Sequence, residues 1–188
     1  MVGSLLVSAV ASVAIGLVIA RSGDEGAPLD AELTRDVSDT VVMPPTLGTN
    51  AAVEGSPLPD VTVQNLQGDG IATADLLGQP LVINIWGSTC GPCKEELPAF
   101  AEAHQLYGDE VRFVGIDYLP PSDREEQFAR DKGVQYELLY DADGEFVTEV
   151  GIAAFPVTLF VTADGTIVQQ TGRLTFDQLT AAIDEHLR

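Results

Sequence analysis

Hydrophobic and polar positions divide the chain into three regions with different patterns. Residues 1–21 contain an uncharged, predominantly apolar stretch that is long enough to span a bilayer as a helix. Residues 22–58 have no apolar periodicity and are rich in acidic residues, Gly, Pro, Ser and Thr, which predicts a disordered, acidic and proline-rich linker. Residues 59–188 alternate short apolar runs with amphipathic segments, which predicts a folded domain.

Within residues 59–188, the pattern predicts strands that alternate with helices, and therefore an α/β fold with a mixed central sheet. The segments LVINIW (81–86) and VRFVGI (111–116) are apolar runs interrupted only by Asn84 and Arg112, and such runs are typical of central strands buried on both faces. Residues 157–170 have Asp164-Gly165 near their middle and predict a β-hairpin. A short strand pair is expected at 61–72, and helices are expected at 90–108, 122–133 and 175–188.

Two interpretations of the first region are open. The stretch from Val2 to Ala20 is either an uncleaved membrane anchor or a signal peptide that is cut after Ala20. Its length favours the anchor, because the apolar part of a signal peptide typically has about 7–15 residues. The only flanking base is Arg21, on the C-terminal side, so the charges do not support a cytoplasmic N-terminus. We expect a single-pass membrane protein with its domain outside the cytoplasm, or a secreted domain if the segment is cleaved.

The charge balance excludes one class of partner. The chain has 29 acidic residues against 9 Lys and Arg, which gives a net charge of -20. Phosphate backbones are bound by basic surfaces, so we expect no nucleic-acid partner. The simplest interpretation of the acidity is solubility or a saline habitat.

The two cysteines, Cys90 and Cys93, are the centre of the candidate chemistry. A zinc site needs about four ligands, and the only histidines, His104 and His186, do not have the spacing of a metal finger. We therefore expect no metal and no other cofactor. A purely structural disulfide is also a weak interpretation, because closing so short a loop constrains the unfolded chain little.

The position of the pair favours redox chemistry. Cys90 follows a predicted buried strand and begins a predicted helix, and a helix N-terminus stabilises a thiolate. Cys90 should therefore have a lowered pKa and act as the attacking sulfur. Cys93 lies one turn further along the helix, within disulfide reach but more covered, and should be the resolving sulfur. Pro92 suits the first turn, where its missing N–H costs nothing.

The segment WGSTCGPCKEELP (86–98) resembles the thioredoxin superfamily, and within it the membrane-tethered TlpA/ResA-like thiol–disulfide oxidoreductases. The resemblance extends over residues 59–188. It implies a thioredoxin-like fold, with a central mixed sheet flanked by helices and an N-terminal strand extension. The matching positions outside the cysteine pair are Trp86, Glu96, Pro98 and the cis-proline loop Phe155-Pro156-Val157-Thr158.

The resemblance also implies roles for individual residues. Cys90 and Cys93 form the redox-active disulfide, and Pro156 is cis and faces them. Backbone beside Pro156 pairs with the substrate chain, so Phe155 and Val157 are candidate substrate-binding residues. The remaining candidates are Trp86, as both core packing and substrate platform, and Glu96, as a catalytic acid that has a simpler interpretation as a helix-dipole acid.

The sequence departs from ordinary thioredoxin at three places. Asn84 stands where thioredoxins have a buried aspartate, and an amide cannot take a proton. Asp117, at the end of the neighbouring predicted strand, is an alternative base, although a solvated loop acid is the simpler interpretation. Residues 87–89 (Gly-Ser-Thr) lack the usual exposed aromatic, and Phe155 is bulkier than the usual residue before the cis-proline.

The sequence thus leads to the hypothesis of an extracytoplasmic thiol–disulfide oxidoreductase that acts on protein disulfides. The Cys-Gly-Pro-Cys pair favours a reductant, because thioredoxin is reducing. The family implies apocytochrome c as one possible substrate and a membrane electron donor of the CcdA/DsbD type. The alternatives are an oxidant for secreted proteins, a thioredoxin-fold peroxidase, and a haem or copper carrier. The peroxidase is disfavoured because its Pro-x-x-x-Thr-x-x-Cys pattern is missing.

Overall fold

The computed structural model of the chain describes residues 49–188. The anchor or signal segment predicted at 1–21 lies outside the described residues, as does most of the linker predicted at 22–58. None of the helices in the described part of the chain is both long and apolar enough to cross a bilayer.

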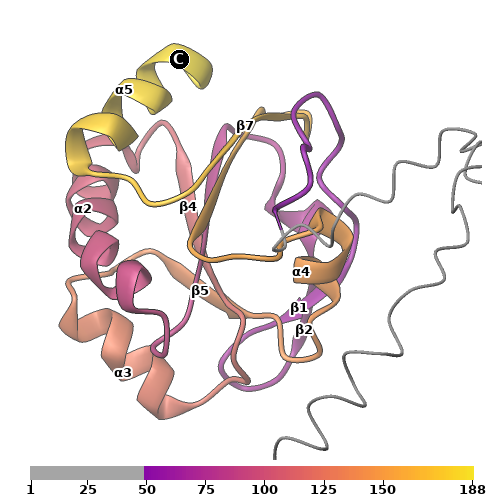
Figure 1. Ribbon diagram of the computed structural model, residues 1–188, viewed down its shortest axis with the longest axis vertical. Coiled ribbons are helices and arrows are strands. Elements are labelled where there is room, and N and C mark those ends of the chain that lie inside the picture. The colour runs from indigo at the N-terminus through magenta and orange to yellow at the C-terminus, as the bar shows by residue number, and fades with distance from the viewer. Residues whose placement is uncertain (1–48) are drawn as a thin grey trace, which may run out of the picture. The chain divides into compact units, whose positions relative to one another are not determined.

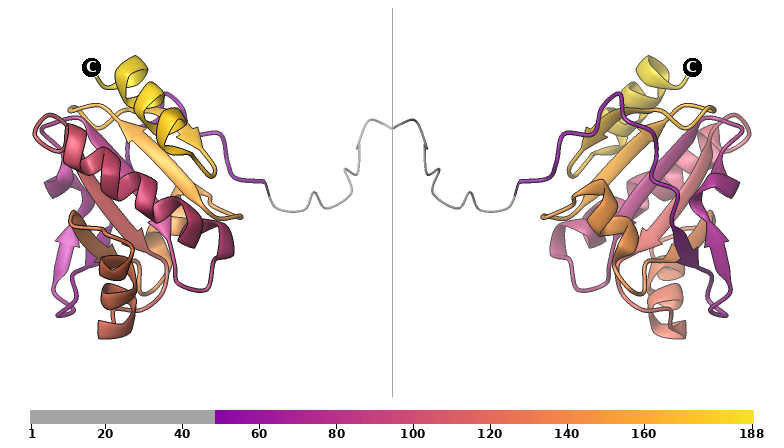
Figure 2. Two further views of the ribbon diagram at one scale, coloured as in Figure 1. Left: turned by 90° about the vertical axis from the view of Figure 1, so that its left-hand side faces the viewer. Right: turned by 90° about the vertical axis from the view of Figure 1, so that its right-hand side faces the viewer.

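The described residues form one seven-stranded sheet with helices on both faces (Figures 1 and 2). The strand order is β2-β1-β5-β4-β3-β6-β7, in which β3, β4 and β5 are parallel to one another and the remaining pairs are antiparallel. The predicted mixed sheet and the N-terminal strand extension are therefore confirmed. The strands are β1 (Thr62–Gln64), β2 (Gly70–Ala72), β3 (Leu81–Trp86), β4 (Arg112–Asp117), β5 (Glu137–Tyr140), β6 (Val157–Val161) and β7 (Ile167–Thr171).

The helices divide between the two faces of the sheet. Figure 1 shows α2, α3 and α5 on one side and α4 on the other. Each side has its own apolar core, with Phe100 of α2 in one cluster and Phe146 of α4 in the other. The helices are η1 (Thr73–Leu76), α2 (Gly91–Tyr107), α3 (Asp123–Asp131), α4 (Glu145–Val150) and α5 (Phe176–His186).

Strand β3 is the central strand and leads directly to the cysteines. All six of its residues are buried, as the continuous apolar run predicted. Because side chains alternate along a strand, Val82, Asn84 and Trp86 share the face that α2 covers. Three residues, 87–89, then connect β3 to the N-terminus of α2. The only polar residue of this strand, Asn84, is thereby placed under the helix that carries both cysteines.

The domain begins earlier than the sequence predicted. Residues 50–58, expected in a disordered linker, run along the domain and bond to it: the Ala51 N–H donates to the Gly151 carbonyl at 2.9 Å, and the Leu58 N–H donates to the Gly165 carbonyl at 2.8 Å. Val53 and Leu58 are buried in the core on the α4 side. The pattern missed this segment because backbone hydrogen bonds and two isolated apolar side chains hold it, and neither produces a periodicity.

Local signals set the ends of the other helices as predicted. Ser122 caps α3, accepting from the Glu125 N–H at 3.3 Å, and Thr175 forms a capping box with Gln178 at the start of α5. The hairpin β6–β7 turns at Gly165, whose φ of 92° suits only glycine.

Candidate active site

The cysteine pair lies at the N-terminus of α2 and is joined as a disulfide, with the two Cα atoms 5.3 Å apart. Cys90 is the N-cap residue, and its sulfur accepts the Cys93 N–H at 3.2 Å. Cys90 is half-buried, whereas Cys93 is 0% exposed. A partner thiol or disulfide can therefore reach the first sulfur, and only a rearranged site would expose the second.

The helix terminus is also electrostatically suited to a thiolate. The first turn of α2 contains Pro92 and no acidic side chain, and Lys94 follows the second cysteine. The free N–H groups and the partial positive charge of a helix N-terminus stabilise an anion at the N-cap. These features favour the thiolate of Cys90 once the disulfide is reduced.

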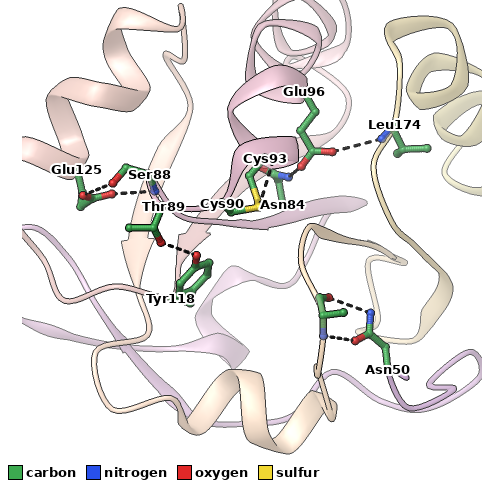
Figure 3. Close-up of a disulfide and its surroundings, with 11 residues drawn as sticks. Asn50, Asn84, Ser88, Thr89, Cys90, Cys93, Glu96, Tyr118, Glu125 and Leu174 are labelled. Carbon is green, nitrogen blue, oxygen red and sulfur yellow. Dashed lines mark hydrogen bonds between the residues drawn. A yellow bond between two sulfur atoms is a disulfide. The ribbon is translucent and has the colours of Figure 1, made fainter. Parts of the chain in front are cut away.

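Glu96 and Asn84 form a buried pair behind Cys93 (Figure 3). The Asn84 amide donates to Glu96 Oε1 at 2.8 Å, and the Leu174 N–H donates to Glu96 Oε2 at 3.3 Å. Burial raises the pKa of Glu96 to about 7, against the lowering effect of both hydrogen bonds and of Arg173. Glu96 is three residues after Cys93 on α2 and shares its helix face.

Glu96 lies in the second turn of α2 and is only 1% exposed, so burial and two hydrogen bonds act on its carboxyl in addition to the helix dipole. A carboxyl with a pKa near neutrality can both accept and return a proton at physiological pH. Asn84, which cannot take a proton, donates the hydrogen bond that orients the carboxyl that can. The sequence departure at position 84 thus has a partner in the structure.

A second buried carboxyl, Asp117, ends strand β4 directly beside Trp86 in the parallel register. Asp117 is 0% exposed, so the interpretation of Asp117 as a solvated loop acid is wrong. Burial raises the pKa of Asp117 to about 8; the Leu119 N–H, which donates to Oδ1 at 2.8 Å, lowers it, and the nearby Glu125 carboxylate raises it further. Its other oxygen has no hydrogen-bond partner within residues 49–188.

Helix α3 holds the loop that precedes Cys90. Glu125, in the first turn of α3, accepts the Ser88 N–H at 3.1 Å and the Ser88 hydroxyl at 2.6 Å (Figure 3). Glu125 is itself buried. Two hydrogen bonds to one residue fix both its backbone and its side chain, so the path of the chain into Cys90 is set from a neighbouring helix.

The Phe155–Pro156 peptide bond is cis, as the resemblance implied, and Pro156 immediately precedes β6. The loop before it is held by Asn50, whose side-chain oxygen accepts the Ala153 and Ala154 N–H groups, each at 2.8 Å. Its amide nitrogen donates to the Ala154 carbonyl at 3.2 Å. A residue that the sequence placed in the linker therefore organises the cis-proline loop.

Two predicted substrate-binding side chains are inaccessible. Trp86 is 0% exposed because the ring of Phe128, from α3, stacks over it with 6.1 Å between centroids. It packs in the core, but it cannot be the exposed platform that the sequence suggested. The Val157 side chain is buried as well, whereas Phe155 remains partly exposed.

The accessible aromatic partner is Tyr118, which the sequence did not single out. Its ring stacks on Phe155 with 4.2 Å between centroids, and its hydroxyl shares a hydrogen bond of 2.9 Å with the Thr89 hydroxyl. It also lies against Gly87, where an added Cβ would come within 2.7 Å of the ring. The signal available in the sequence was an aromatic residue one position beyond the strand that pairs with β3.

Comparisons with known proteins agree with this site. Residues 55–170 match the AhpC/TSA family. The chain is 26% identical over 130 residues to the thiol-disulfide oxidoreductase ResA of Bacillus subtilis, covering 68% of this chain and 73% of ResA. It resembles a secreted Mycobacterium tuberculosis disulfide oxidoreductase homologous to E. coli DsbE (26% identity, TM-score 0.58, 67% and 96% of the two chains). It also resembles a DsbF homologue from Corynebacterium diphtheriae (25% identity, TM-score 0.61, 69% and 86%).

The family match spans most of the described domain and includes the cysteine pair and the cis-proline loop. The chain therefore belongs to the AhpC/TSA family of thioredoxin-fold proteins, and it is a thiol–disulfide oxidoreductase of the ResA/DsbE type.

Proposed function

We propose that this protein reduces disulfides in other proteins outside the cytoplasm. The observation that carries the proposal is the pairing of an accessible sulfur, Cys90, with a buried one, Cys93, beside a carboxyl group of pKa about 7. The Gly-Pro dipeptide between the cysteines is that of thioredoxin, a reducing protein.

The first step joins the protein to its substrate. In the reduced protein, the Cys90 thiolate attacks one sulfur of the substrate disulfide, forms a mixed disulfide and releases the other substrate sulfur as a thiolate. That thiolate then takes up a proton from solvent. The N-terminus of α2 lowers the cost of the attacking anion.

The second step releases the product. Cys93 gives its proton to the Glu96 carboxylate and attacks the Cys90 sulfur, which frees the remaining substrate thiolate. Two electrons have then passed from the cysteine pair to the substrate, and the protein carries the disulfide between Cys90 and Cys93. In the reduction that must follow, protonated Glu96 returns a proton to Cys93.

The substrate chain binds beside cis-Pro156, on the aromatic pair of Tyr118 and Phe155. The family usually has an exposed aromatic just before the first cysteine, and this chain has Thr89 there instead. Tyr118 supplies an aromatic surface from the neighbouring loop, with its hydroxyl hydrogen-bonded to Thr89. A rigid ring pair of this kind offers apolar contact at little entropic cost.

We further propose that the protein is held at the membrane by residues 2–20 and is reduced again by a membrane donor of the CcdA/DsbD type. Apocytochrome c, whose haem-binding thiols must be reduced, is one substrate consistent with this direction of electron flow. The similarity to ResA and to a DsbE homologue supports the thiol–disulfide exchange that this assignment requires.

Trapping the mixed disulfide tests the proposed function. In the full-length protein, Cys93→Ser should accumulate a covalent complex with a disulfide-containing client, because the resolving sulfur is gone. Cys90→Ser should form none, because Cys93 is buried. The complexes are measured by non-reducing electrophoresis and mass spectrometry. Equal trapping by both variants, or by neither, would contradict the assignment.

A further inference from the structure

The basic side chains of this acidic protein are unevenly distributed. Within residues 49–188, most arginines have a carboxylate partner: Arg112, Arg130, Arg173 and Arg188. Lys94, Arg124 and Lys132 have no such ion pair among the described residues. These three residues also gather in one place, where α2 faces α3. These unpaired bases place a group of positive charges on one part of the surface of a chain whose net charge is -20.

Lys132 lies over the Phe128 ring, and the other two bases, Lys94 and Arg124, line a groove to which this ring contributes. Its volume is about 360 Å³, and Phe128 forms its aromatic surface. The ammonium groups of Lys94 and Lys132 lie 5.9 and 5.7 Å from the centre of this ring. The ring is fixed from below, because it stacks on the buried Trp86. The lining residues are Ser88, Lys94, Arg124, Gln127, Phe128 and Asp131.

The groove lies close in sequence to the cysteine pair, although neither cysteine lines it. Ser88 lies two residues before Cys90, and Lys94 immediately follows Cys93. Two acids near the groove have partners: Glu125 accepts both Ser88 donors, and Glu126 pairs with Arg130. Asp131 also lines the groove and accepts from the neutral Gln127, so it keeps its negative charge, but the two lining bases, Lys94 and Arg124, outnumber it.

We propose that this groove binds an acidic segment of the protein whose disulfide reacts with Cys90. The inference rests on the proposed function and adds the chemistry of the partner. Carboxylates near the partner's cysteine contact Lys94, Arg124 and Lys132, and an adjacent apolar side chain covers Phe128. The net charge of the protein alone would favour basic partners. A measured preference for acidic residues beside the partner's cysteine would therefore have to come from the groove and not from the overall electrostatic field.

The experiment compares two disulfide peptides that are identical except for acidic or basic residues flanking the cysteine. The full-length protein is assayed at 0.15 M salt, where charges further apart than roughly 8 Å are largely screened. We expect kcat/KM for the acidic peptide to exceed that for the basic peptide by about 5- to 10-fold. Arg124→Glu should reduce this ratio to one or below. Arg124 is an exposed residue with no hydrogen-bond partner within the described residues, so the fold should tolerate the change.

Two controls make the result specific. Arg188→Glu changes the net charge equally, far along the chain from the groove, and should leave the ratio unchanged. The small neutral disulfide 2-hydroxyethyl disulfide should react at the same rate with all three proteins. A ratio that is near one in the unmodified protein, or that Arg124→Glu does not alter, would overturn the inference.

The outcomes also distinguish a failure of this inference from a failure of the proposed function. If 2-hydroxyethyl disulfide is not reduced by the unmodified protein, the proposed function fails and the inference fails with it. If the acidic peptide reacts faster with Arg124→Glu, an acidic segment of the chain itself occupies the groove, and the partner assignment is overturned.

Discussion

Besides Glu125, which holds the loop before Cys90, two carboxyl groups are buried around the cysteine pair: Glu96 and Asp117. Burial raises the pKa of both, to about 7 and about 8, so each changes its protonation state in the physiological range. They differ in position: Glu96 shares a helix face with Cys93, and Asp117 lies beside Trp86 at the end of β4. Glu96 is therefore placed for proton transfer with Cys93, whereas Asp117 has a structural position at the edge of the site.

Removing the proton carrier should slow the step in which Cys93 attacks. Glu96→Gln keeps the shape but cannot take a proton, and its single amide oxygen can accept from only one of the two present donors, Asn84 and Leu174. We expect the resolution of the mixed disulfide to slow by about 100-fold and to lose its dependence on a group of pKa about 7. The rate is measured by rapid quench between pH 5 and pH 9.

The matched control is Glu95→Gln, at the exposed neighbouring position on the same helix. It should leave both the rate and the pH profile unchanged. A Glu96→Gln protein with the normal profile would show that the proton goes elsewhere.

Asp117 should make the fold less stable as the pH rises. Its folded-state pKa is raised from 3.8 to about 8, so the native state holds a proton that the unfolded chain has lost over this interval. Its contribution to stability is therefore present below pH 3.8 and is lost as the pH rises through about 8. Glu96 acts with the same sign between 4.5 and about 7.

Asp117→Asn should remove this loss, since an amide does not titrate and its oxygen can still accept the Leu119 N–H. We expect the free energy of unfolding, measured with urea, to decline less between pH 5 and pH 8.5 in the variant. A decline equal to that of the unmodified protein would mean that Asp117 does not hold a proton in the native state.

At the scale of elements, five parts of the chain contribute to the site. The loop before Cys90 is bonded to α3 through Glu125, and the cis-proline loop is bonded to the start of the domain through Asn50. Tyr118, beyond β4, joins the two loops by contacting both Thr89 and Phe155. The accessible surface around the sulfur is therefore composed by tertiary contacts rather than by the cysteine motif alone.

The Tyr118–Phe155 stack can be tested without altering the cysteines. Tyr118→Ala removes the ring, and we expect kcat/KM with a protein disulfide to fall by about tenfold. Tyr118→Phe keeps the ring and loses only the hydrogen bond to Thr89, so its kcat/KM should fall by no more than about threefold. 2-Hydroxyethyl disulfide, which is too small to use the platform, should react normally. Equal loss with the small disulfide would indicate a damaged site instead.

The sequence predicted the elements that have a local signal. The buried run of β3, the cysteines at a helix start and the Ser122 cap all depend on neighbouring residues, and the structure confirms each. The cis-proline was implied by the family resemblance and is confirmed as well. The contacts that the sequence missed are long-range. Asn50 is 104 residues from Ala154, to which it bonds, and no local pattern encodes that distance.

Burial was the second source of error. Trp86, as a substrate platform, and Asp117, as a solvated loop acid, were expected to have some access to solvent, and both are fully buried. Whether a polar residue at the end of a strand or in the second turn of a helix is solvated depends on what packs above it. That information is tertiary, so a single sequence gives only the alternatives.

At the scale of the whole molecule, the net charge affects which partners can approach, and the reduction potential sets the direction of electron flow. A net charge of -20 gives a surface that repels acidic partners at long range, and the groove beside Phe128 provides a local exception. The cysteine pair must also be reduced again after each turnover. A reductant therefore needs both a client and a donor, and its reduction potential must lie between theirs.

The most direct test of the central claim is the reduction potential of the cysteine pair in the full-length protein. It is measured by equilibration with glutathione, with the fraction of disulfide between Cys90 and Cys93 determined at each ratio. We expect a value well below about -220 mV, as for a donor of electrons to other disulfides. A value near about -120 mV would instead mark a strong oxidant and would contradict the proposed direction of electron flow.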